Sequence, residues 1–431
     1  MANDGIAIRD TRTGQDIASR ALEFAFAAFL LLVFIGLSPF AVRDPNVLVN
    51  GETIAAGEGD LIRQICYLLV FFTIVAVAIH REGWRTLDAM PVMLTVLLVW
   101  CGLSALWSPE PDITIRRVGL EVVVVMSVML SVNNLGVERC LRIFRLVLAL
   151  VLIVNWISIP LLPQAVHLPN ETDPSIIGDW RGLYFHKNIT GAVCAVSAML
   201  FLYYAIRDKS RTDWFLLAAT IGFLVMTRSK SSMGLLPLAV IAGAVYFWAW
   251  RRALDRAIVT VAVLLLVVVA VSVALLNYET ISRVLSDPQE FTGRTAIWQA
   301  EIAFIRDHAW LGSGFGSFAD TGALSPLHNY VGASWVDAVS HGHNGYLQLI
   351  VTIGLIGFAI AMVAIIFTPG GAFWRIDGMD RLLKAFLFSL FVFFVFHNLT
   401  ESDFLESDGA SWVVFLMMMA VLRDYRLRQV S

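Results

Sequence analysis

Long apolar runs alternate with short polar segments along most of this 431-residue chain. Because a helix needs about 20 residues to cross the hydrocarbon of a bilayer, each long apolar run predicts a membrane-spanning helix. The pattern therefore predicts an all-α polytopic membrane protein. The predicted spans are centred in twelve runs: 20–37, 61–79, 89–107, 118–133, 141–160, 190–206, 213–227, 232–250, 257–276, 344–367, 383–397 and 410–422.

One polar segment, residues 277–343, is much longer than the others. A structureless loop of that length would be unusual, so we expect it to contain helices and to help form a site. Residues 293–305 have the pattern of an amphipathic helix. No strand precedes the glycine-rich stretch 311–318, which predicts a tight turn rather than a phosphate-binding loop. The predicted organisation is an N-terminal tail (1–19), nine spans (20–276), the large loop (277–343), three spans (344–422) and a C-terminal tail (423–431).

Composition agrees with this class. Hydrophobic residues make up 58% of the chain and charged residues 15%, which excludes an ordinary soluble domain. Residues 1–19 are polar and lack the pattern of a cleavable signal peptide. Cys66, Cys101, Cys140 and Cys194 show no metal-like spacing, so we predict free thiols, with neither a disulfide nor a metal site. The net charge of −3 says little about partners, and no nucleic-acid partner is expected.

The basic residues predict an orientation. With a cytoplasmic N-terminus, most of the 31 lysines and arginines fall in the inner segments, as the positive-inside rule requires. Both tails are then cytoplasmic and the 277–343 loop lies outside. The distribution also supports the short span 213–227, because removing it would place the downstream arginine clusters on the outer side.

His343 stands where the large loop meets the tenth predicted span. An imidazole can take or give a proton near neutral pH, so His343 is the candidate catalytic residue. The alternative is that it caps the helix or lies in the membrane interface. Its neighbours His341 and Asn344 are the supporting candidates, and Glu401, in the last outer loop, is expected to pair with an outer arginine.

Cations gather on the same predicted side. Arg228 and Lys230 lie in a very tight hairpin between two spans, where intramembrane cations are costly and usually functional. Arg181 and Lys187 precede the sixth span and suit phosphate, although snorkelling at a helix end is the alternative. Arg117 either marks the membrane boundary or helps hold an anionic lipid headgroup. With Arg294 and His343, these residues favour chemistry on an anionic, lipid-linked substrate if their loops meet.

The same positions carry a family resemblance. The motifs are Arg181-Gly182 followed by His186-Lys187-Asn188, the Arg228-Ser229 turn, Gly293-Arg294 with Trp298, and His343-Asn344-Gly345-Tyr346-Leu347 ahead of Gly354-Leu355-Ile356-Gly357. Together they resemble the superfamily of O-antigen ligases and Wzy-type polysaccharide polymerases, over residues 90–422. The stretches 104–109 and 398–401 are more similar to its exopolysaccharide polymerase (ExoQ-like) branch. Members often have an acidic residue before the glycine of the tenth helix, where this chain has Thr352 and Ile353.

The resemblance implies a GT-C-like glycosyltransferase fold in the bacterial inner membrane, with its site on the periplasmic face. It implies metal-independent, inverting transfer without a cofactor, from an undecaprenyl-diphosphate-linked oligosaccharide to a glycan acceptor. In that reaction His343 would activate the acceptor hydroxyl, and Arg181, Arg228 and Arg294 would bind the diphosphate. Lys187, Lys230 and Arg117 would support them. Expected partners are membrane lipids, with a chain-length regulator and export proteins as further candidates.

Four functions remain open from the sequence. A polymerase and a ligase share donor chemistry and differ in the acceptor. A transporter or flippase is less favoured because the chain lacks a convincing internal repeat and a matched pair of broken helices. A scaffold for polysaccharide export would tolerate loss of His343.

Overall fold

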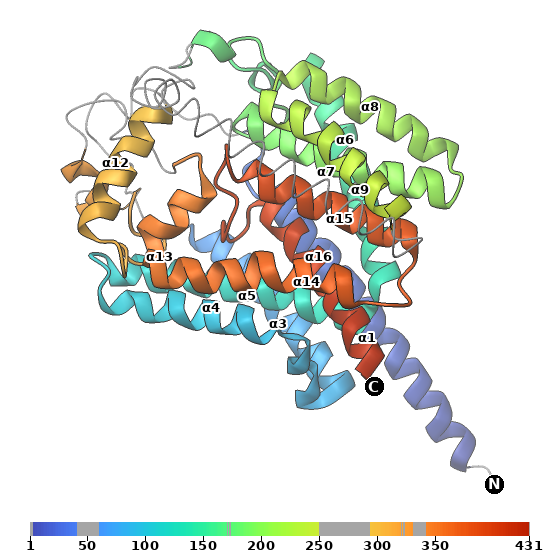
Figure 1. Cartoon of the computed structure of the whole chain (residues 1–431). Coiled ribbons are helices and arrows are strands. Elements are labelled where there is room, and N and C mark those ends of the chain that lie inside the picture. The colour runs from blue at the N-terminus through green and yellow to red at the C-terminus, as the bar shows by residue number, and fades with distance from the viewer. Residues whose placement is uncertain are drawn as a thin grey trace.

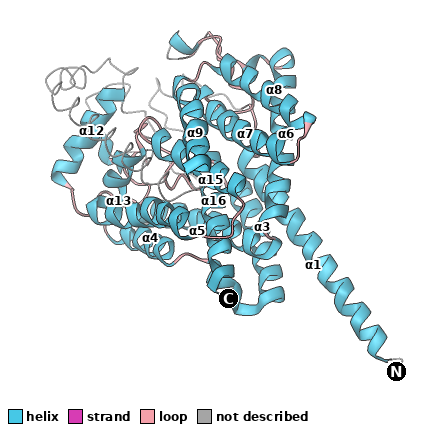
Figure 2. Cartoon of the chain, turned by 45° about the vertical axis from the view of Figure 1, so that its right-hand side comes forward, coloured by secondary structure: helices cyan, strands magenta, loops and turns pink. Residues whose placement is uncertain are grey.

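The computed structural model describes residues 3–40, 60–169, 171, 174–249, 294–319, 321, 324–330 and 342–430, without the side chains of 3–16 and 430. Every named element in these ranges is a helix (Figures 1 and 2). The α-helices described up to residue 249 are α1 (Asn3–Phe34), α3 (Leu61–Glu82), α4 (Val92–Leu103), α5 (Pro111–Leu135), α6 (Val137–Leu161), α7 (Lys187–Arg207), α8 (Arg211–Thr227) and α9 (Lys230–Ala249).

The later helices complete the bundle. They are α12 (Arg294–Asp307), α13 (Gly345–Ala361), the π-helix η9 (Met362–Phe367), α14 (Thr368–Arg375), α15 (Arg381–His397) and α16 (Ala410–Val430). Short 3₁₀ helices are η1 (Gly83–Ala89), η2 (Ser104–Leu106), η3 (Pro163–Ala165), η4 (Pro174–Ile176) and η7 (Pro326–Asn329). Helix α12 confirms the amphipathic helix predicted in the large loop.

The helices are those of a multi-pass membrane protein. Each predicted span coincides with a helix, except 257–276, which lies outside the described residues. Within the described residues, seven helices are long and apolar enough to cross a membrane: 17–34, 61–89, 111–135, 137–161, 187–207, 230–249 and 345–375. Helices α4, α8 and α15 are apolar but shorter, with α8 and α15 at 17 residues each. The chain is thus an all-α polytopic membrane protein.

Helix α7 forms the centre of one half of the bundle. It packs against α8, α9 and α15, and 83% of the residues in its most apolar stretch are buried. A Cβ added at Gly191 would lie 2.5 Å from the Cβ of Ser229, so the absence of a side chain lets the α8–α9 turn approach α7 closely. This contact holds the turn that carries Arg228 beside the start of α7.

Helix α13 is broken, which corrects the prediction of one continuous helix over 344–367. Gly354 has φ 69°, and a Cβ there would overlap the carbonyl oxygen of Trp310. The carbonyls released by the break accept hydrogen bonds from neighbouring segments. Ser313 N and Gly314 N donate to the carbonyl oxygens of residues 351 and 352, each at 2.8 Å, and Trp100 Nε1 donates to that of residue 353 at 3.0 Å.

The glycine-rich turn, residues 311–318, therefore docks against the break in α13. Figures 1 and 2 show α13 running beside α4, with α12 packed at its N-terminal end. Both chain termini lie at one end of the molecule, and α12 lies at the other. The docked turn ties the segment that follows α12 to the middle of α13.

Candidate functional site

The start of α13 fixes the backbone of His343. Asn344 caps the helix, because its Oδ1 accepts hydrogen bonds from the N–H groups of Tyr346 and Leu347, each at 3.1 Å. His343 lies directly before the cap with φ 51°, a left-handed conformation that is uncommon for a residue with a side chain. The sequence prediction of a histidine at the lip of this helix is confirmed. Asn344 has a structural role in holding it there.

The 398–409 loop is tied to the same helix start. Gly345 N donates to the carbonyl oxygens of Asn398, at 2.8 Å, and Glu401, at 2.9 Å. A Cβ at Gly345 would overlap Asn398 Oδ1, so only glycine permits this approach. Asn398 Oδ1 also accepts from the N–H groups of Asp403 and Phe404. These bonds bring Glu401 to His343 across 58 residues of chain.

Glu401 is the hub of the site. Its Oε2 lies 3.1 Å from His343 Nδ1, and its Oε1 accepts from Arg294 Nη2 at 2.8 Å and from Asn188 Nδ2 at 2.8 Å. Arg294 Nη1 also donates to the carbonyl oxygen of Thr400. The carboxylate is only 11% exposed, and the side chain of His343 is 23% exposed. The ion pair expected of Glu401 with an arginine is formed with Arg294.

The electrostatics of Glu401 keep its carboxyl group ionised. Burial alone would raise its pKa, but the hydrogen bond with His343 and the charge of Arg294 outweigh burial and lower the pKa below 4.5. A carboxylate beside Nδ1 favours the tautomer with a proton on Nδ1, and this leaves the lone pair on Nε2 of His343. The imidazole is thereby oriented as a base.

A second group of cations surrounds Asp179. This carboxylate is 1% exposed and pairs with Lys187 Nζ at 2.5 Å and with Arg228 Nη1 at 3.2 Å. Arg228 ends α8 with φ 49°, and its side chain is 73% exposed. Asn188, which contacts Glu401, directly follows Lys187. The two groups of charged residues are therefore joined through consecutive residues at the start of α7.

Arg181 lies in the same segment but faces its own loop. Its side chain is buried, with Nε donating to the carbonyl oxygen of Gln164 at 2.6 Å and Nη1 to that of Phe185 at 3.0 Å. These bonds tie Arg181 to Gln164 and to Phe185. They give Arg181 a structural role, and its predicted contact with a diphosphate stays a prediction.

The remaining predicted residues are placed differently. Arg117 Nη1 donates to the carbonyl oxygen of Gly316 and so joins α5 to the glycine-rich turn. Lys230 is exposed at the start of α9, and its amino group has no ion pair within the described part of the chain. His341 lies outside the described residues.

Two residues that organise the site were missed as site residues. Asn188 stands only within a motif of the family resemblance, and no pattern in the sequence marks Asp179 as a site residue. Asp179 lies two residues before Arg181 and eight before Lys187, and this spacing indicates that it could pair with one of them. Nothing in the sequence indicates that Asp179 selects Lys187 and Arg228 rather than Arg181.

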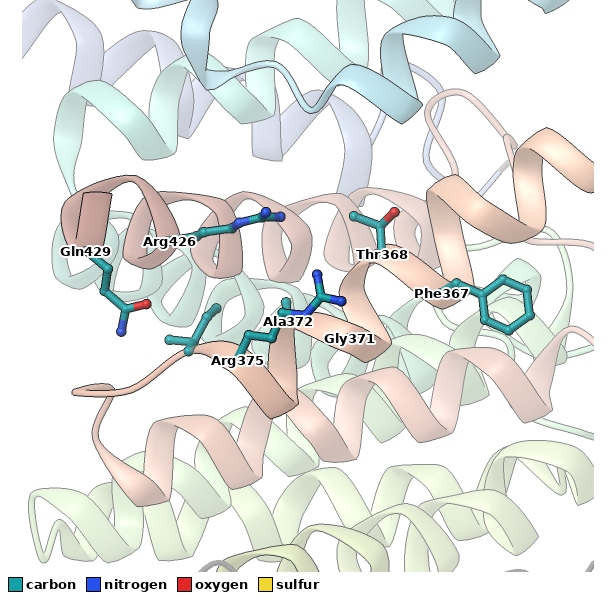
Figure 3. A pocket seen from close by; sticks show the side chains of 8 residues that line it. Phe367, Thr368, Gly371, Ala372, Arg375, Arg426 and Gln429 are labelled. Atoms are coloured by element: carbon teal, nitrogen blue, oxygen red, sulfur yellow. The ribbon is translucent and has the colours of Figure 1, made fainter. Parts of the chain in front are cut away.

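A pocket of about 330 Å³ lies elsewhere, between α14 and α16. Figure 3 shows Arg375 and Arg426 directed into the space between these helices, with Thr368 and Phe367 at one end and Gln429 at the other. None of its lining residues belongs to the cluster around Glu401. The pocket is therefore separate from the candidate site.

Comparison with known proteins supports the resemblance drawn from the motifs. Residues 215–362 match the O-antigen ligase family, a stretch that contains Arg228, Arg294 and His343. The match confirms similarity to the superfamily of O-antigen ligases and Wzy-type polymerases, and it does not single out the exopolysaccharide polymerase branch. No protein of curated function shows a significant match to the chain.

Proposed function

We propose that this chain, similar to O-antigen ligases over residues 215–362, is a polymerase of exopolysaccharide or O-antigen-type repeat units. In this proposal it transfers glycan from an undecaprenyl-diphosphate-linked donor to a sugar hydroxyl of the acceptor. The observation that carries the proposal is the contact of Glu401 with both His343 and Arg294. It places a candidate base and a candidate phosphate-binding cation on the two oxygens of one buried carboxylate.

His343 acts as the base in this proposal. Its Nε2 takes the proton of the acceptor hydroxyl, while Nδ1–H remains bonded to Glu401, whose charge stabilises the imidazolium that forms. The acceptor oxygen attacks the anomeric carbon from the face opposite the diphosphate. The new C–O bond forms as the bond to the diphosphate oxygen breaks with its electron pair, so the configuration inverts.

Arg294, Arg228 and Lys187 stabilise the leaving group. Negative charge grows on the diphosphate as the glycosidic bond breaks, and cations already held in place lower the energy of that state. Arg228 is the most exposed of the three and retains donors beyond its single bond to Asp179. A lipid diphosphate is already a good leaving group, which fits the metal-independent chemistry implied by the resemblance.

The proposal includes an orientation. The site lies on the periplasmic face of a bacterial inner membrane, and both termini are cytoplasmic. Support comes from the distribution of arginines and from the position of both termini at the end opposite α12 (Figure 1). Membrane lipids then surround the bundle, and a chain-length regulator and export proteins are candidate partners.

A ligase reaction is the second candidate. It uses the same donor chemistry and passes the glycan to a lipid or protein acceptor. The family match supports it, because that family is described as O-antigen ligase.

The test is glycan transfer by the purified protein in lipid, supplied with an undecaprenyl-diphosphate-linked repeat unit. The wild type should give a ladder of lipid-linked oligomers, and His343→Ala should abolish it. His80→Ala, which removes an exposed imidazole at the far end of α3, is the matched control and should leave the ladder intact.

Three other results would change the conclusion. Donor consumption only when a separate lipid or protein acceptor is added would establish the ligase reaction. An active His343→Ala variant would refute the role of the base. Absence of transfer with every donor tested would refute the enzyme proposal and return transport and scaffolding to consideration.

A further inference from the structure

Glu301 is a buried carboxyl group that the proposed reaction does not use. It lies on α12 seven residues after Arg294 and three after Trp298, on the same face of the helix. Its relative exposure is 0%, and within the described part of the chain neither carboxyl oxygen has a hydrogen-bond partner. Buried polar groups are normally paired, so an unpaired carboxyl group needs an explanation.

The carboxyl group faces the residue directly before His343. A Cβ added at Gly342 would overlap Glu301 Oε1 and would lie 2.7 Å from Oε2. Gly342 N already donates to Gln348 Oε1 at 3.2 Å, and its carbonyl oxygen accepts from Trp298 Nε1 at 2.9 Å. Both oxygens of Glu301 therefore press on the Cα side of Gly342, where glycine alone leaves room.

Helix α12 contacts the candidate site through three of its side chains. Helix α12 thus touches the site at three places: Arg294 binds Glu401, Trp298 binds Gly342, and Glu301 packs on Gly342. A leucine or methionine would fill the same space without leaving donors or acceptors unpaired. The carboxyl group at this position is therefore not explained by packing alone.

The charge state of Glu301 decides whether this contact can form. Burial raises the pKa of the carboxyl group to about 8, so it is protonated at neutral pH. The charged and titratable groups on α12 and on the segments around it are Arg294, Arg306, Asp307, His308, His328, Tyr330, Tyr346, His343 and Glu401. None of them pairs with Glu301 within the described residues.

Ionisation would place an unpaired charge against Gly342. An unpaired carboxylate is far more costly to bury than a carboxylic acid, and it would draw water into the contact. The Gly342 backbone would then shift, and the adjacent His343 would shift with it.

We propose that Glu301 is a positioning residue for His343, acting through its contact with the backbone of Gly342. The proposal rests on the proposed function of His343 as the base. Glu301 itself touches neither donor nor acceptor in this account. Its neutral form holds the His343 backbone in the left-handed conformation from which the imidazole reaches Glu401.

The first test follows His343 without relying on catalysis. The eight histidines are labelled with ¹³C in the ring, and the signal of His343 is identified by its loss in His343→Gln. In the wild type this signal should shift with an inflection near pH 8, as Glu301 ionises. Glu301→Gln should remove that inflection, and Asp307→Asn, which changes an exposed carboxylate on the same helix, should keep it.

The second test compares kinetic constants. Glu301→Ala should lower kcat by about tenfold or more with little change in KM, because orientation rather than binding is lost. Wild-type activity should decline above pH 8 as Glu301 ionises. Glu301→Gln, which keeps the size and the neutral charge, should restore most of the rate lost in Glu301→Ala and remove this decline.

The outcomes separate the two proposals. A His343 signal without the inflection, or one that keeps it in Glu301→Gln, would overturn the positioning role even if transfer activity is present. An inactive wild type would overturn the proposed function, and the spectra would still decide whether Glu301 controls His343. Equal kcat in Glu301→Ala and wild type would also overturn the positioning role.

Discussion

Replacing Glu401 by glutamine is the most direct test of the site. The substitution keeps the size of the side chain and removes the charge that holds His343 and Arg294. The wild-type carboxylate meets them at 3.1 Å and 2.8 Å and is 11% exposed, so solvent screens both contacts only weakly. The variant also presents an NH₂ group where the structure requires an acceptor on both sides.

The magnitude follows from the contact with His343. A hydrogen bond to a charged group contributes about 1.5–3 kcal/mol, and it matters most in the transition state, when His343 carries a proton. Since about 1.4 kcal/mol corresponds to a factor of ten, Glu401→Gln should lower kcat by about 10- to 150-fold. The loss is smaller than in His343→Ala because the imidazole is still present.

The assay is single-turnover transfer from the lipid-linked donor, with Glu401→Gln, His343→Ala and the double variant compared. Residues that act as a unit are not additive, so the double variant should be no slower than His343→Ala alone. Asp112→Asn, at an exposed carboxylate near the start of α5, is the control and should match the wild type.

Two results would refute this reasoning. One is a Glu401→Gln variant that transfers glycan at the wild-type rate. The other is a double variant whose losses multiply, since Glu401 would then act independently of His343.

Three further predictions concern stability and donor binding. The folded-state pKa of Glu401 is lowered below 4.5, so the contribution of its carboxylate to stability is fully present above about pH 4.5 and is lost as the pH falls. Thermal unfolding of the wild type and of Glu401→Gln across this pH range measures that contribution. Gly354→Ala should destabilise the protein by about 2–4 kcal/mol through strain and overlap, whereas Gly371→Ala, where a Cβ meets open space, should not; denaturant titration measures both. Arg228→Ala should fold normally and raise KM for the donor. Arg181→Ala should lower the yield of folded protein, because the carbonyl groups that Arg181 binds lose their hydrogen-bond donor. A folded Arg181→Ala variant with a raised KM would instead place Arg181 in the binding site.

Sequence pattern was sufficient for the features that depend on local physics. Membrane burial acts on each stretch of about 20 residues separately, so apolar runs predicted the helices without knowledge of their neighbours. The same applies to α12, whose apolar face repeats with the helical period, and to His343, which stands at a polar-to-apolar boundary.

Tertiary structure alone decided which charges meet. Glu401 draws together Asn188, Arg294 and His343, which lie 58 to 213 positions from it along the chain, with no local pattern to link them. Arg181 and Arg228 look equivalent in sequence, yet one is buried against backbone carbonyls and the other is exposed. Whether an arginine can bind a substrate depends on the residues packed around it, because nearby backbone carbonyls compete with the substrate for its N–H donors.

The break in α13 shows the same limit. An apolar run with Gly354 is compatible with a continuous helix, and it breaks here because the backbone around Trp310 occupies the space of a Cβ. The sequence by itself determined which runs form apolar helices and which residue types stand at the ends of those runs. Only the tertiary structure decided where a helix opens and which carboxylate orients the histidine, because hydrogen bonds are made between groups that are close in space, whatever their separation along the chain.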